Sequence, residues 1–386
     1  MGTPQMWDRG SVGILALAPN VWDGPWMNRQ QLLSRLGPDY DVIYTTGPIS
    51  KYPRGARHPQ LWPRVEAREN VRVDLLPTWM KRAARRHLPG RFVTHALVKR
   101  WRSLLGHRPS ICWCFHPSYW PLVAALEPRF VVYHVFDLYR LQGRWTPTLE
   151  KYETNLASRA DLTVASSGVI ADHLRRVGAR APLLVENAAD YASFALDPSE
   201  DPPDLAPIPR PRIGYIGALN RKVDFQALLR VASHRPDWQV VLIGAIGNLD
   251  AVSQHAVTHL QSLPNVHFLG FKDRAQLAGY AARMDVNLLA YRVSGDLWTE
   301  GIYPLKLHEY LAAGQPVVST DLPSIRQFAD VVRIVEDSRW EEAIESVLVC
   351  PGDKARRRAV ASVNSWESRV AILETHLREM LSHAHN

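Results

Sequence analysis

A lysine and a glutamate stand three residues apart near the start of a short helix predicted over residues 306–313. Lys306 lies in the first turn, and Glu309 follows on the same face of the helix. Before the helix, Gly301 and Pro304 predict an irregular loop, which leaves backbone N–H groups at the helix N-terminus free to bind a ligand. Such a helix end attracts anions, and phosphate above all.

A diphosphate would satisfy all three features of this segment. A cation in the first turn opposes the helix dipole, so Lys306 requires a negative partner, and a phosphate bound by the N–H groups supplies one. Glu309 would then accept hydrogen bonds from ribose hydroxyls. A surface helix with an ordinary Lys–Glu pair is the alternative that this local pattern leaves open.

Glycines follow three other predicted strands, and polar or aromatic residues come close behind them. Glycine lets a ligand approach the backbone, and cations beside it could bind a diphosphate. These residues are Gly217 with Arg221 and Lys222, Gly244, and Gly270 with Phe271. Their spacing is not G-x-G-x-x-G, so the sequence lacks the fingerprint of nicotinamide-dinucleotide binding.

The elements that must position these residues alternate between strand and helix. Continuous apolar strands such as residues 12–18 and 130–136 are separated by helical stretches, which predicts a parallel sheet covered on both faces. The proline-rich segment 196–212 is typical of a semi-rigid linker, and the alternation resumes after it. The sequence therefore predicts an α/β protein with two doubly wound domains facing a cleft, with ligands at the carboxyl ends of the strands.

A chain of 386 residues exceeds one typical core, which agrees with two domains. We predict an N-terminal domain over residues 1–203 and a C-terminal domain over residues 204–364. The last helix, within residues 365–386, carries apolar residues at helical spacing, and we expect it to pack back on the N-terminal domain.

Several classes of protein are disfavoured by composition. No run of about 18 apolar residues exists, and the N-terminus lacks the pattern of a signal peptide, which favours a cytoplasmic location. The three cysteines are too few and scattered for a disulfide framework. Cys112 and Cys114 alternate along one apolar run, which indicates core packing, and no His or Cys set has the spacing of a metal site.

The net charge of +8 is concentrated in one segment. Residues 51–110 hold 15 Lys and Arg against three acidic residues, which gives 15 − 3 = +12. Apolar and basic residues alternate within residues 77–106, as in amphipathic helices that lie on anionic membranes or bind acidic acceptors. A solvated helical face is the alternative. A nucleic acid could bind the same positive charge, but the sequence contains no recognisable nucleic-acid-binding motif, so we expect no nucleic-acid partner.

The C-terminal half resembles a known family. The segments GYIGAL, NVHFLG, DVNLLAYR and PLKLHEYLAAGQPVVST are similar to the donor-binding half of GT-B glycosyltransferases, with a family 4-like donor domain. The resemblance covers residues 210–325 well and extends more loosely to the N-terminal half. The enzymes that the chain resembles are bacterial enzymes of polysaccharide and cell-wall polymer synthesis, of the teichuronic-acid type.

The resemblance implies an acceptor-binding N-terminal domain, residues 1–203, and a donor-binding C-terminal domain, residues 204–364. It also implies roles for individual residues. Glu309 would bind the ribose, Leu305 and Lys306 the donor diphosphate, and Gly270 and Phe271 would border the base. Tyr303, in the loop before the helix, joins the donor-binding candidates together with the strand-end residues named above.

One departure from the family leaves the stereochemistry open. Many retaining relatives have a second glutamate eight residues before the ribose-binding one, and Gly301 stands there, with Glu300 one residue out of register. An inverting enzyme needs a base for the acceptor hydroxyl, and Asp137, after strand 130–136, fits that need. The resemblance to inverting glucuronosyltransferases of exopolysaccharide synthesis implies that such an aspartate acts together with a lysine like Lys306. A helix N-cap is the alternative role for Asp137. Asp23 and Arg29, in the first loop, are candidate acceptor contacts.

These observations predict a glycosyltransferase that moves a sugar from a nucleotide diphosphate-sugar to an acceptor hydroxyl, on a lipid-linked or polysaccharide acceptor. We expect it to work at the cytoplasmic membrane face, as a peripheral protein, without a metal or other cofactor. A nucleotide-sugar 2-epimerase of the same fold, or a non-catalytic protein that binds nucleotide-sugar or polysaccharide, are the alternatives.

Overall fold

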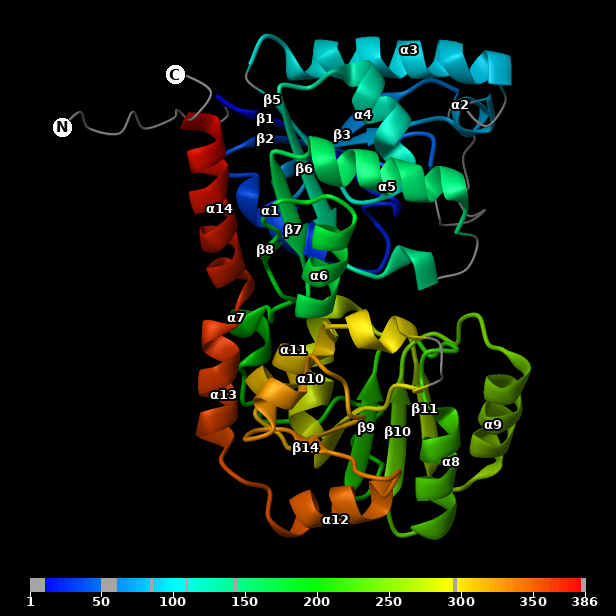
Figure 1. The fold of residues 1–386 in the computed structure, drawn as a ribbon. Helices are drawn as coiled ribbons and strands as arrows, with labels where there is room; N and C mark the ends of the chain where they lie inside the picture. The colour runs from blue at the N-terminus through cyan, green and yellow to red at the C-terminus, as the bar shows by residue number, and fades with distance from the viewer. Residues whose placement is uncertain are drawn as a thin grey trace, which may run out of the picture. The chain divides into compact units, whose positions relative to one another are not determined.

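The computed structural model describes residues 11–49, 61–83, 87–108, 110–141, 145–293 and 297–382. The chain divides into two compact units. The N-terminal unit contains Met1–Glu186 and Arg369–Asn386, and the C-terminal unit contains Asn187–Ser368. Figure 1 shows both units as sheets covered by helices.

The N-terminal unit is built on an eight-stranded sheet within the described residues. Its order is β3-β4-β2-β1-β5-β6-β7-β8, and all neighbours are parallel except β3 and β4, which form an antiparallel pair at one edge. The strands are β1 (Gly13–Leu17), β2 (Asp41–Thr45), β3 (Arg64–Arg68), β4 (Val71–Leu75), β5 (Ser110–Cys114), β6 (Phe130–Val135), β7 (Leu162–Ala165) and β8 (Leu183–Leu184).

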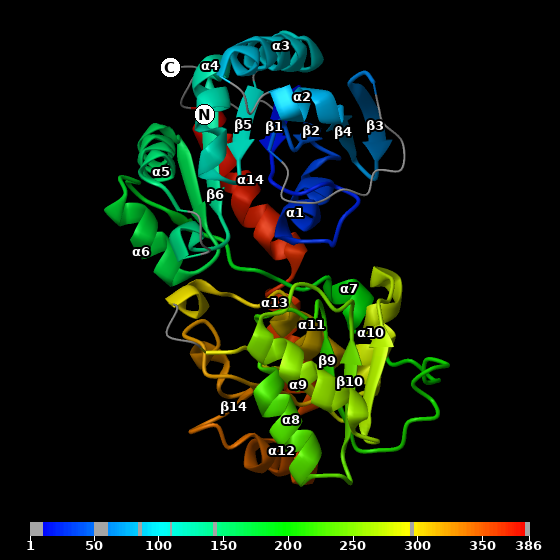
Figure 2. The same ribbon diagram turned by 90° about the vertical axis from the view of Figure 1, so that its right-hand side faces the viewer.

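Helices cover both faces of this sheet (Figure 2). They are α1 (Asn28–Leu36), α2 (Thr78–Ala83), α3 (His87–Leu105), α4 (Trp120–Leu126), α5 (Pro147–Arg159), α6 (Gly168–Arg176) and the part of α14 (Trp366–Ser382) from Arg369 on. Two short 3-10 helices are Pro117–Tyr119 and Tyr139–Leu141. The central strands are buried along their whole length, as the continuous apolar runs predicted. Cys112 and Cys114 are free thiols in this core, and burial raises the pKa of Cys114 to about 12.

In the described residues of the C-terminal unit, six parallel strands form a sheet of order β11-β10-β9-β12-β13-β14. The strands are β9 (Arg212–Ile216), β10 (Gln239–Ile243), β11 (Val266–Gly270), β12 (Val286–Leu289), β13 (Val317–Ser319) and β14 (Arg333–Ile334). The order reverses direction between β9 and β12. This topological switch is where doubly wound sheets bind ligands.

Two apolar clusters bury the two faces of this sheet. One includes residues of α7 (Tyr191–Phe194), α10 (Arg274–Arg283), α11 (Lys306–Ala313) and α13 (Lys354–Val363). The other includes residues of α8 (Phe225–His234), α9 (Ala251–Ser262) and α12 (Trp340–Val349). Leu297–Gly301 and Arg326–Phe328 are short 3-10 helices. The fold is therefore the α/β pair of doubly wound domains that the sequence predicted.

The proline-rich segment differs from the predicted linker. Leu205 and Ile208 are buried in the core of the C-terminal unit, and Arg212 forms an ion pair of 2.8 Å with Asp201. The segment belongs to the C-terminal unit because its apolar side chains pack into the core of that unit. The two compact units divide at Glu186, earlier than the boundary at residue 203 that the prolines suggested.

Candidate active site

The helix that carries the predicted phosphate contacts begins at Lys306, as expected. Leu305 is the N-cap of this helix, and its side chain forms no hydrogen bond to the first turn. The first N–H groups of the helix are therefore not capped by that side chain. Glu309 is the acidic residue of the first turn, and Gly314 ends the helix with a φ of 85°. The Tyr310 hydroxyl accepts a hydrogen bond of 2.9 Å from the N–H of Ile216, which fixes α11 against the carboxyl end of β9.

Lys306 is half-buried and contacts an aromatic ring in place of a carboxylate. Its ammonium donates a hydrogen bond of 2.6 Å to the hydroxyl of Tyr215 and lies 3.9 Å from the centre of that ring. Burial lowers the pKa of Lys306 to about 7, although the charge of Glu309 partly opposes this shift. An anion placed beside this ammonium would restore its full positive charge.

Three glycines lie at the carboxyl ends of adjacent strands, and Gly217 among them lies against Lys306. Gly217 donates its N–H to the carbonyl of Ile243 over 2.7 Å, and Gly244 donates to the carbonyl of Gly270 over 2.8 Å. Gly217 and Gly244 have φ values of 141° and 145°, which side chains rarely adopt. A β-carbon on Gly244 would lie 2.0 Å from the carbonyl oxygen of Gly217. Gly270, by contrast, has no described atom within 4 Å of an added β-carbon, so a ligand could approach the backbone closely there.

Glu309 lies half-buried on the same helix as Lys306. Burial raises the pKa of its carboxyl to about 7, and the nearby Asp190 adds to this while Arg274 and Lys306 oppose it. Arg274 itself forms an ion pair with Asp190. Within the described part of the chain, the Glu309 carboxylate forms no hydrogen bond or ion pair. It is thus able to accept hydrogen bonds from a ligand's hydroxyl groups.

The remaining predicted donor contacts lie in the loops after β9 and β11. Arg221 is exposed, and its backbone N–H donates to the carbonyl of Asn248 over 3.1 Å. Lys222 is half-buried, and its N–H donates to the side chain of Asn220 over 2.9 Å. The ring of Phe271 is 69 % exposed, so it offers an uncovered aromatic face.

Tyr303 has a packing role that its sequence position did not reveal. Its side chain is buried, and its hydroxyl lies 2.7 Å from Nε2 of His308. Its carbonyl accepts a hydrogen bond of 2.6 Å from Asn187. This burial does not support a side-chain contact between Tyr303 and a donor. The half-buried Leu305 remains a backbone candidate because it is the N-cap of α11.

The site contains residues that were absent from the predicted set. Tyr215 and Tyr310 hold Lys306 and α11 in place, and Asp190 and Arg274 surround Glu309. A tyrosine in the buried strand β9 has the same sequence pattern as any core residue, so Tyr215 gave no signal of its own. Asp190 precedes a four-residue helix that the sequence pattern did not predict.

In the N-terminal unit, Asp137 lies half-buried between the end of β6 and the 3-10 helix Tyr139–Leu141. Its charge adds to the rise in the pKa of Tyr139, which burial causes in the main. Asp137 therefore lies after the carboxyl end of a central strand, where the sequence placed it.

Arg29 lies at the same edge of the sheet as Asp137. It stands in the first turn of α1, is 93 % buried since only 7 % of its surface is exposed, and donates a hydrogen bond to the side chain of Asn20. Its guanidinium carbon lies 5.4 Å from the ring centre of Phe136, the residue before Asp137. The structure thus brings Arg29 next to the strand end that carries the candidate base.

Two other polar residues of this unit have different surroundings. His134 is fully buried among aromatic rings, and burial together with the charge of Arg29 lowers its pKa well below the usual value, so it is neutral core. Asp23 is exposed and forms an ion pair of 3.3 Å with Arg68 of β3. This surface pair gives Asp23 a partner, and its contact with an acceptor stays a prediction.

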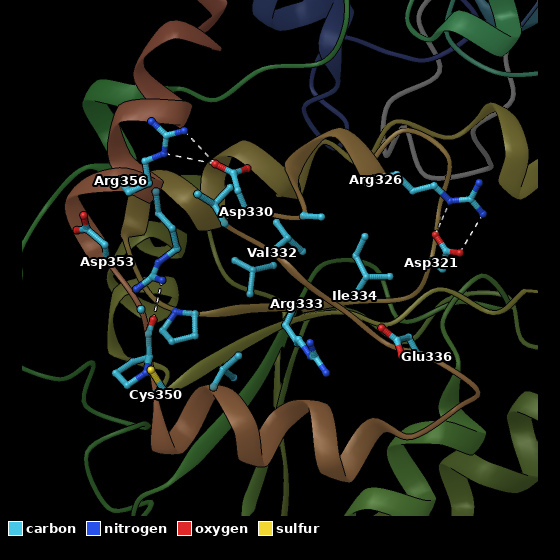
Figure 3. Close-up of a pocket in the computed structure, with 18 residues that line it drawn as sticks. Asp321, Arg326, Asp330, Val332, Arg333, Ile334, Glu336, Cys350, Asp353 and Arg356 are labelled. Atoms are coloured by element: carbon cyan, nitrogen blue, oxygen red, sulfur yellow. Dashed lines mark hydrogen bonds and ion pairs between the residues drawn. The ribbon is translucent and has the colours of Figure 1, made fainter.

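A separate hollow of about 570 Å³ lies beside β14 in the C-terminal unit (Figure 3). Ile334 lines it, and ion pairs border it between Arg326 and Asp321 and between Arg356 and Asp330. None of the predicted donor residues lines this hollow. It is therefore distinct from the site at the ends of β9, β10 and β11.

Two further findings concern the described residues as a whole. Within the ranges that the structure describes, no group of three or more His, Cys, Asp or Glu side chains is placed to hold a metal ion. None of the helices in those ranges is long and apolar enough to cross a lipid bilayer.

The fold is that of known glycosyltransferases. Anabaena HepE in complex with UDP-glucose superposes with a TM-score of 0.70 at 16 % identity, over 95 % of this chain and 99 % of HepE. Sucrose-phosphate synthase from Thermosynechococcus elongatus superposes with a TM-score of 0.69 at 17 % identity, over 97 % of this chain and 100 % of that enzyme. The two doubly wound units are those of the GT-B fold.

The sequence comparisons identify the class of enzyme. Residues 210–363 match the family model described as "Glycosyl transferases group 1". The chain is 29 % identical over 278 residues to TuaH of Bacillus subtilis (strain 168), which carries the name of a teichuronic acid biosynthesis glycosyltransferase. The match covers 66 % of this chain and 68 % of TuaH. Residues 210–363 are thus a group 1 glycosyltransferase domain, and the chain is a glycosyltransferase of the GT-B fold.

Proposed function

We propose that this glycosyltransferase moves a sugar from a nucleotide diphosphate-sugar to a hydroxyl of a lipid-linked or polysaccharide acceptor. The observation that carries the donor assignment is the position of Lys306, whose ammonium lies against the backbone of Gly217 at the N-terminus of α11. A diphosphate there would receive the ammonium charge and the first-turn N–H groups together. The HepE structures are complexes with UDP and with UDP-glucose, which supports a nucleotide-sugar donor here.

The donor would be held by groups with separate tasks. Glu309 would accept hydrogen bonds from the ribose hydroxyls, and Gly270 and Phe271 would border the base. Arg221 and Lys222 would add positive charge near the diphosphate. In this proposal, cations and the helix N-terminus stabilise the leaving nucleoside diphosphate without a metal cofactor.

Asp137 would act as the base that removes the proton from the acceptor hydroxyl. A half-buried carboxylate at the end of β6 has the chemistry that this step requires. Arg29 would add positive charge for an anionic acceptor, because it lies buried beside the same strand end. The transfer breaks the bond between the sugar's anomeric carbon and the diphosphate and forms a bond from that carbon to the acceptor oxygen.

The basic segment supports a location on an anionic membrane surface. Phe92 and Trp62 are 78 % and 76 % exposed, and Trp79 is half exposed. On α3, Lys99 is exposed and lies seven residues after Phe92, which places both on the same side of the helix, and Arg91 is exposed beside Phe92 in the sequence. Exposed aromatic and basic residues together are typical of helices that lie at the bilayer interface.

A nucleotide screen tests the donor assignment. We expect nucleoside diphosphates to raise the melting temperature more than the matched monophosphates, because the ammonium of Lys306 would contact the diphosphate. A ligand at about 100 times its Kd adds about 2.7 kcal/mol of stability, which a thermal-shift measurement resolves easily. A protein that no nucleoside diphosphate or nucleotide-sugar stabilises would contradict the proposal.

A further inference from the structure

Tyr215 gives the Lys306 ammonium a fixed position within the C-terminal unit. Its ring is 98 % buried, with only 2 % exposed, and its backbone pairs with Leu242 in the centre of the sheet. A side chain with such packing has little freedom to move. The hydroxyl that receives the Lys306 hydrogen bond is therefore held by the core of the domain.

The partner of Lys306 is neutral, which is unusual for a half-buried ammonium. Burial raises the pKa of Tyr215 well above its usual value, so its hydroxyl stays protonated at any physiological pH. Glu309 forms no ion pair with Lys306 within the described residues. A tyrosine oxygen orients the ammonium without neutralising its charge, whereas a carboxylate at the same place would repel a phosphate.

We propose that Tyr215 is a positioning residue for donor binding, which fixes the ammonium of Lys306 against Gly217 and leaves its charge available to a diphosphate. This inference rests on the proposed function, because it assumes that the diphosphate binds at Lys306. It adds to that function a residue that acts through Lys306: the hydroxyl and ring of Tyr215 contact the lysine ammonium and not the ligand.

The groups that face Lys306 determine how this contact depends on pH. They are Tyr215 from β9, Tyr291 after β12, whose ring centre lies 5.5 Å from the ammonium, and Glu309 of α11. Asp190 and Arg274 act on Lys306 indirectly, through Glu309. With a pKa of about 7, Lys306 loses its charge above neutral pH in the free protein. Ionisation of Glu309 over the same range favours its hydrogen bonds to ribose, so the two groups affect affinity with opposite sign.

Removal of the hydroxyl alone separates positioning from packing. Tyr215→Phe keeps the buried ring, and loses the oxygen that stabilises the charged form of Lys306. We expect the Kd for UDP at pH 8 to rise about tenfold, which is the usual effect of losing a hydrogen bond to a charged group. The pH above which affinity declines should also move to lower values, because the ammonium then loses its proton more easily.

The experiment is calorimetric titration of the full chain with UDP between pH 6 and 9, for four proteins. They are the wild type, Tyr215→Phe, Lys306→Met and the control Tyr119→Phe, which removes the hydroxyl that donates to the carbonyl of Thr46 in the N-terminal unit. Lys306→Met should bind weakly and lose the decline above pH 7, which identifies Lys306 as the group that titrates. Tyr119→Phe should bind as the wild type does. Thermal unfolding of each variant reports whether it is folded.

The possible outcomes distinguish failure of the inference about Tyr215 from failure of the proposed function. A shifted pH profile for folded Tyr215→Phe supports the inference. A profile equal to that of the wild type, while Lys306→Met binds poorly, rejects the positioning role and leaves the donor site standing. A weaker Kd with an unmoved profile also rejects it, because the hydroxyl then does not act through the charge of Lys306. If the wild type binds neither UDP nor GDP, CDP or ADP under the same conditions, both the inference and the proposed function fail.

Discussion

The side chain of Lys306 lies directly over the backbone of Gly217. A β-carbon on Gly217 would be 2.4 Å from Cε of Lys306 and 2.7 Å from its Nζ, which is closer than any real contact. The end of β9 and the start of α11 therefore meet at a position where only glycine leaves room for the ammonium. This relationship explains why a glycine and a lysine separated widely in the sequence form one site.

Substitution of this glycine should weaken both donor binding and stability. Gly217→Ala places a methyl group where the Lys306 ammonium lies, so the lysine must move away, and we expect the affinity for UDP to fall by at least tenfold. The backbone strain at a φ of 141° should lower the free energy of unfolding by about 1–3 kcal/mol. Titration with UDP and thermal unfolding measure the two effects.

Gly106→Ala is the matched control for this substitution. Gly106 also has a positive φ, of 67°, but no atom of the described residues lies within 4 Å of an added β-carbon. The control should lose some stability and keep wild-type binding. Equal affinity for UDP in Gly217→Ala and the wild type would show that Lys306 does not need its present position.

Lys306→Met should make the free protein more stable while it weakens donor binding. The substitution removes a partly desolvated cation and keeps a side chain of similar length, so we expect a gain of about 1 kcal/mol, or roughly 2–4 °C in Tm, at pH 6–7. Lys151→Met, on the exposed surface of α5, is the control that should change neither property. A loss of stability in Lys306→Met would contradict the view that the Lys306 ammonium is partly desolvated in the free protein.

The sequence predicted the strand-end glycines and the Lys306–Glu309 pair because glycine after an apolar strand and a cation at a helix start are local patterns. It did not predict Tyr215, since its contact with Lys306 depends on the tertiary meeting of β9 and α11. The antiparallel pair β3 and β4 was missed because Arg64–Arg68 is rich in charge and lies at a sheet edge.

The basic helical segment was only partly interpretable from its sequence. Met80, Leu97 and Trp101, which alternate with basic residues, are buried in the core of the N-terminal unit. Asp74 also offsets part of the local charge, because it pairs with Arg100 over 2.7 Å. A helical pattern shows which residues share a face, but not whether that face meets a protein core or a membrane.

The pH dependence of stability should have opposite slopes on the two sides of neutrality. The pKa of Glu309 rises from 4.5 to about 7 on folding, so the native state binds more protons between these values and stability falls as pH rises through them. The pKa of Lys306 falls from 10.5 to about 7, so the unfolded state binds more protons above pH 7 and stability rises with pH there. These two groups therefore contribute a minimum near pH 7.

Variants assign each slope to its residue. Glu309→Gln should flatten the decline between about pH 4.5 and 7, and Lys306→Met the rise above pH 7, in denaturant unfolding measured across this range. Saturating UDP should reduce the slope above pH 7, since the anion keeps Lys306 charged. A wild-type profile unchanged by either substitution would mean that neither group is desolvated as the structure indicates.

Asp137→Asn should abolish transfer and leave donor binding intact. The amide is nearly the same size as the carboxylate but cannot accept the acceptor proton, so we expect turnover to fall by about 10²–10⁴-fold. Affinity for UDP should stay within twofold of the wild type, because Asp137 belongs to the other compact unit. Release of nucleoside diphosphate in the presence of acceptor measures turnover. If the variant keeps the wild-type rate, Asp137 is not the base.

The exposed residues of α3 should govern binding to anionic membranes. Arg91→Glu with Lys99→Glu reverses two charges that form no ion pair within the described residues, and Phe92→Ser removes a ring that is 78 % exposed. Each basic residue near an anionic surface contributes about 1 kcal/mol, so we expect the charge reversals to weaken binding by more than tenfold. Sedimentation with vesicles that contain phosphatidylserine measures the change.

Vesicles of neutral lipid and a variant of the other unit complete this test. Val349→Ser removes an apolar side chain that is 81 % exposed in the C-terminal unit, and it should sediment with anionic vesicles as the wild type does. Phe92→Ser should weaken binding at high and low salt alike, because its contribution is apolar, whereas the charge reversals should matter most at low salt. Equal recovery of the wild-type protein from neutral and anionic vesicles would reject the electrostatic part of the proposal. Loss of binding in Val349→Ser would move the membrane contact away from α3.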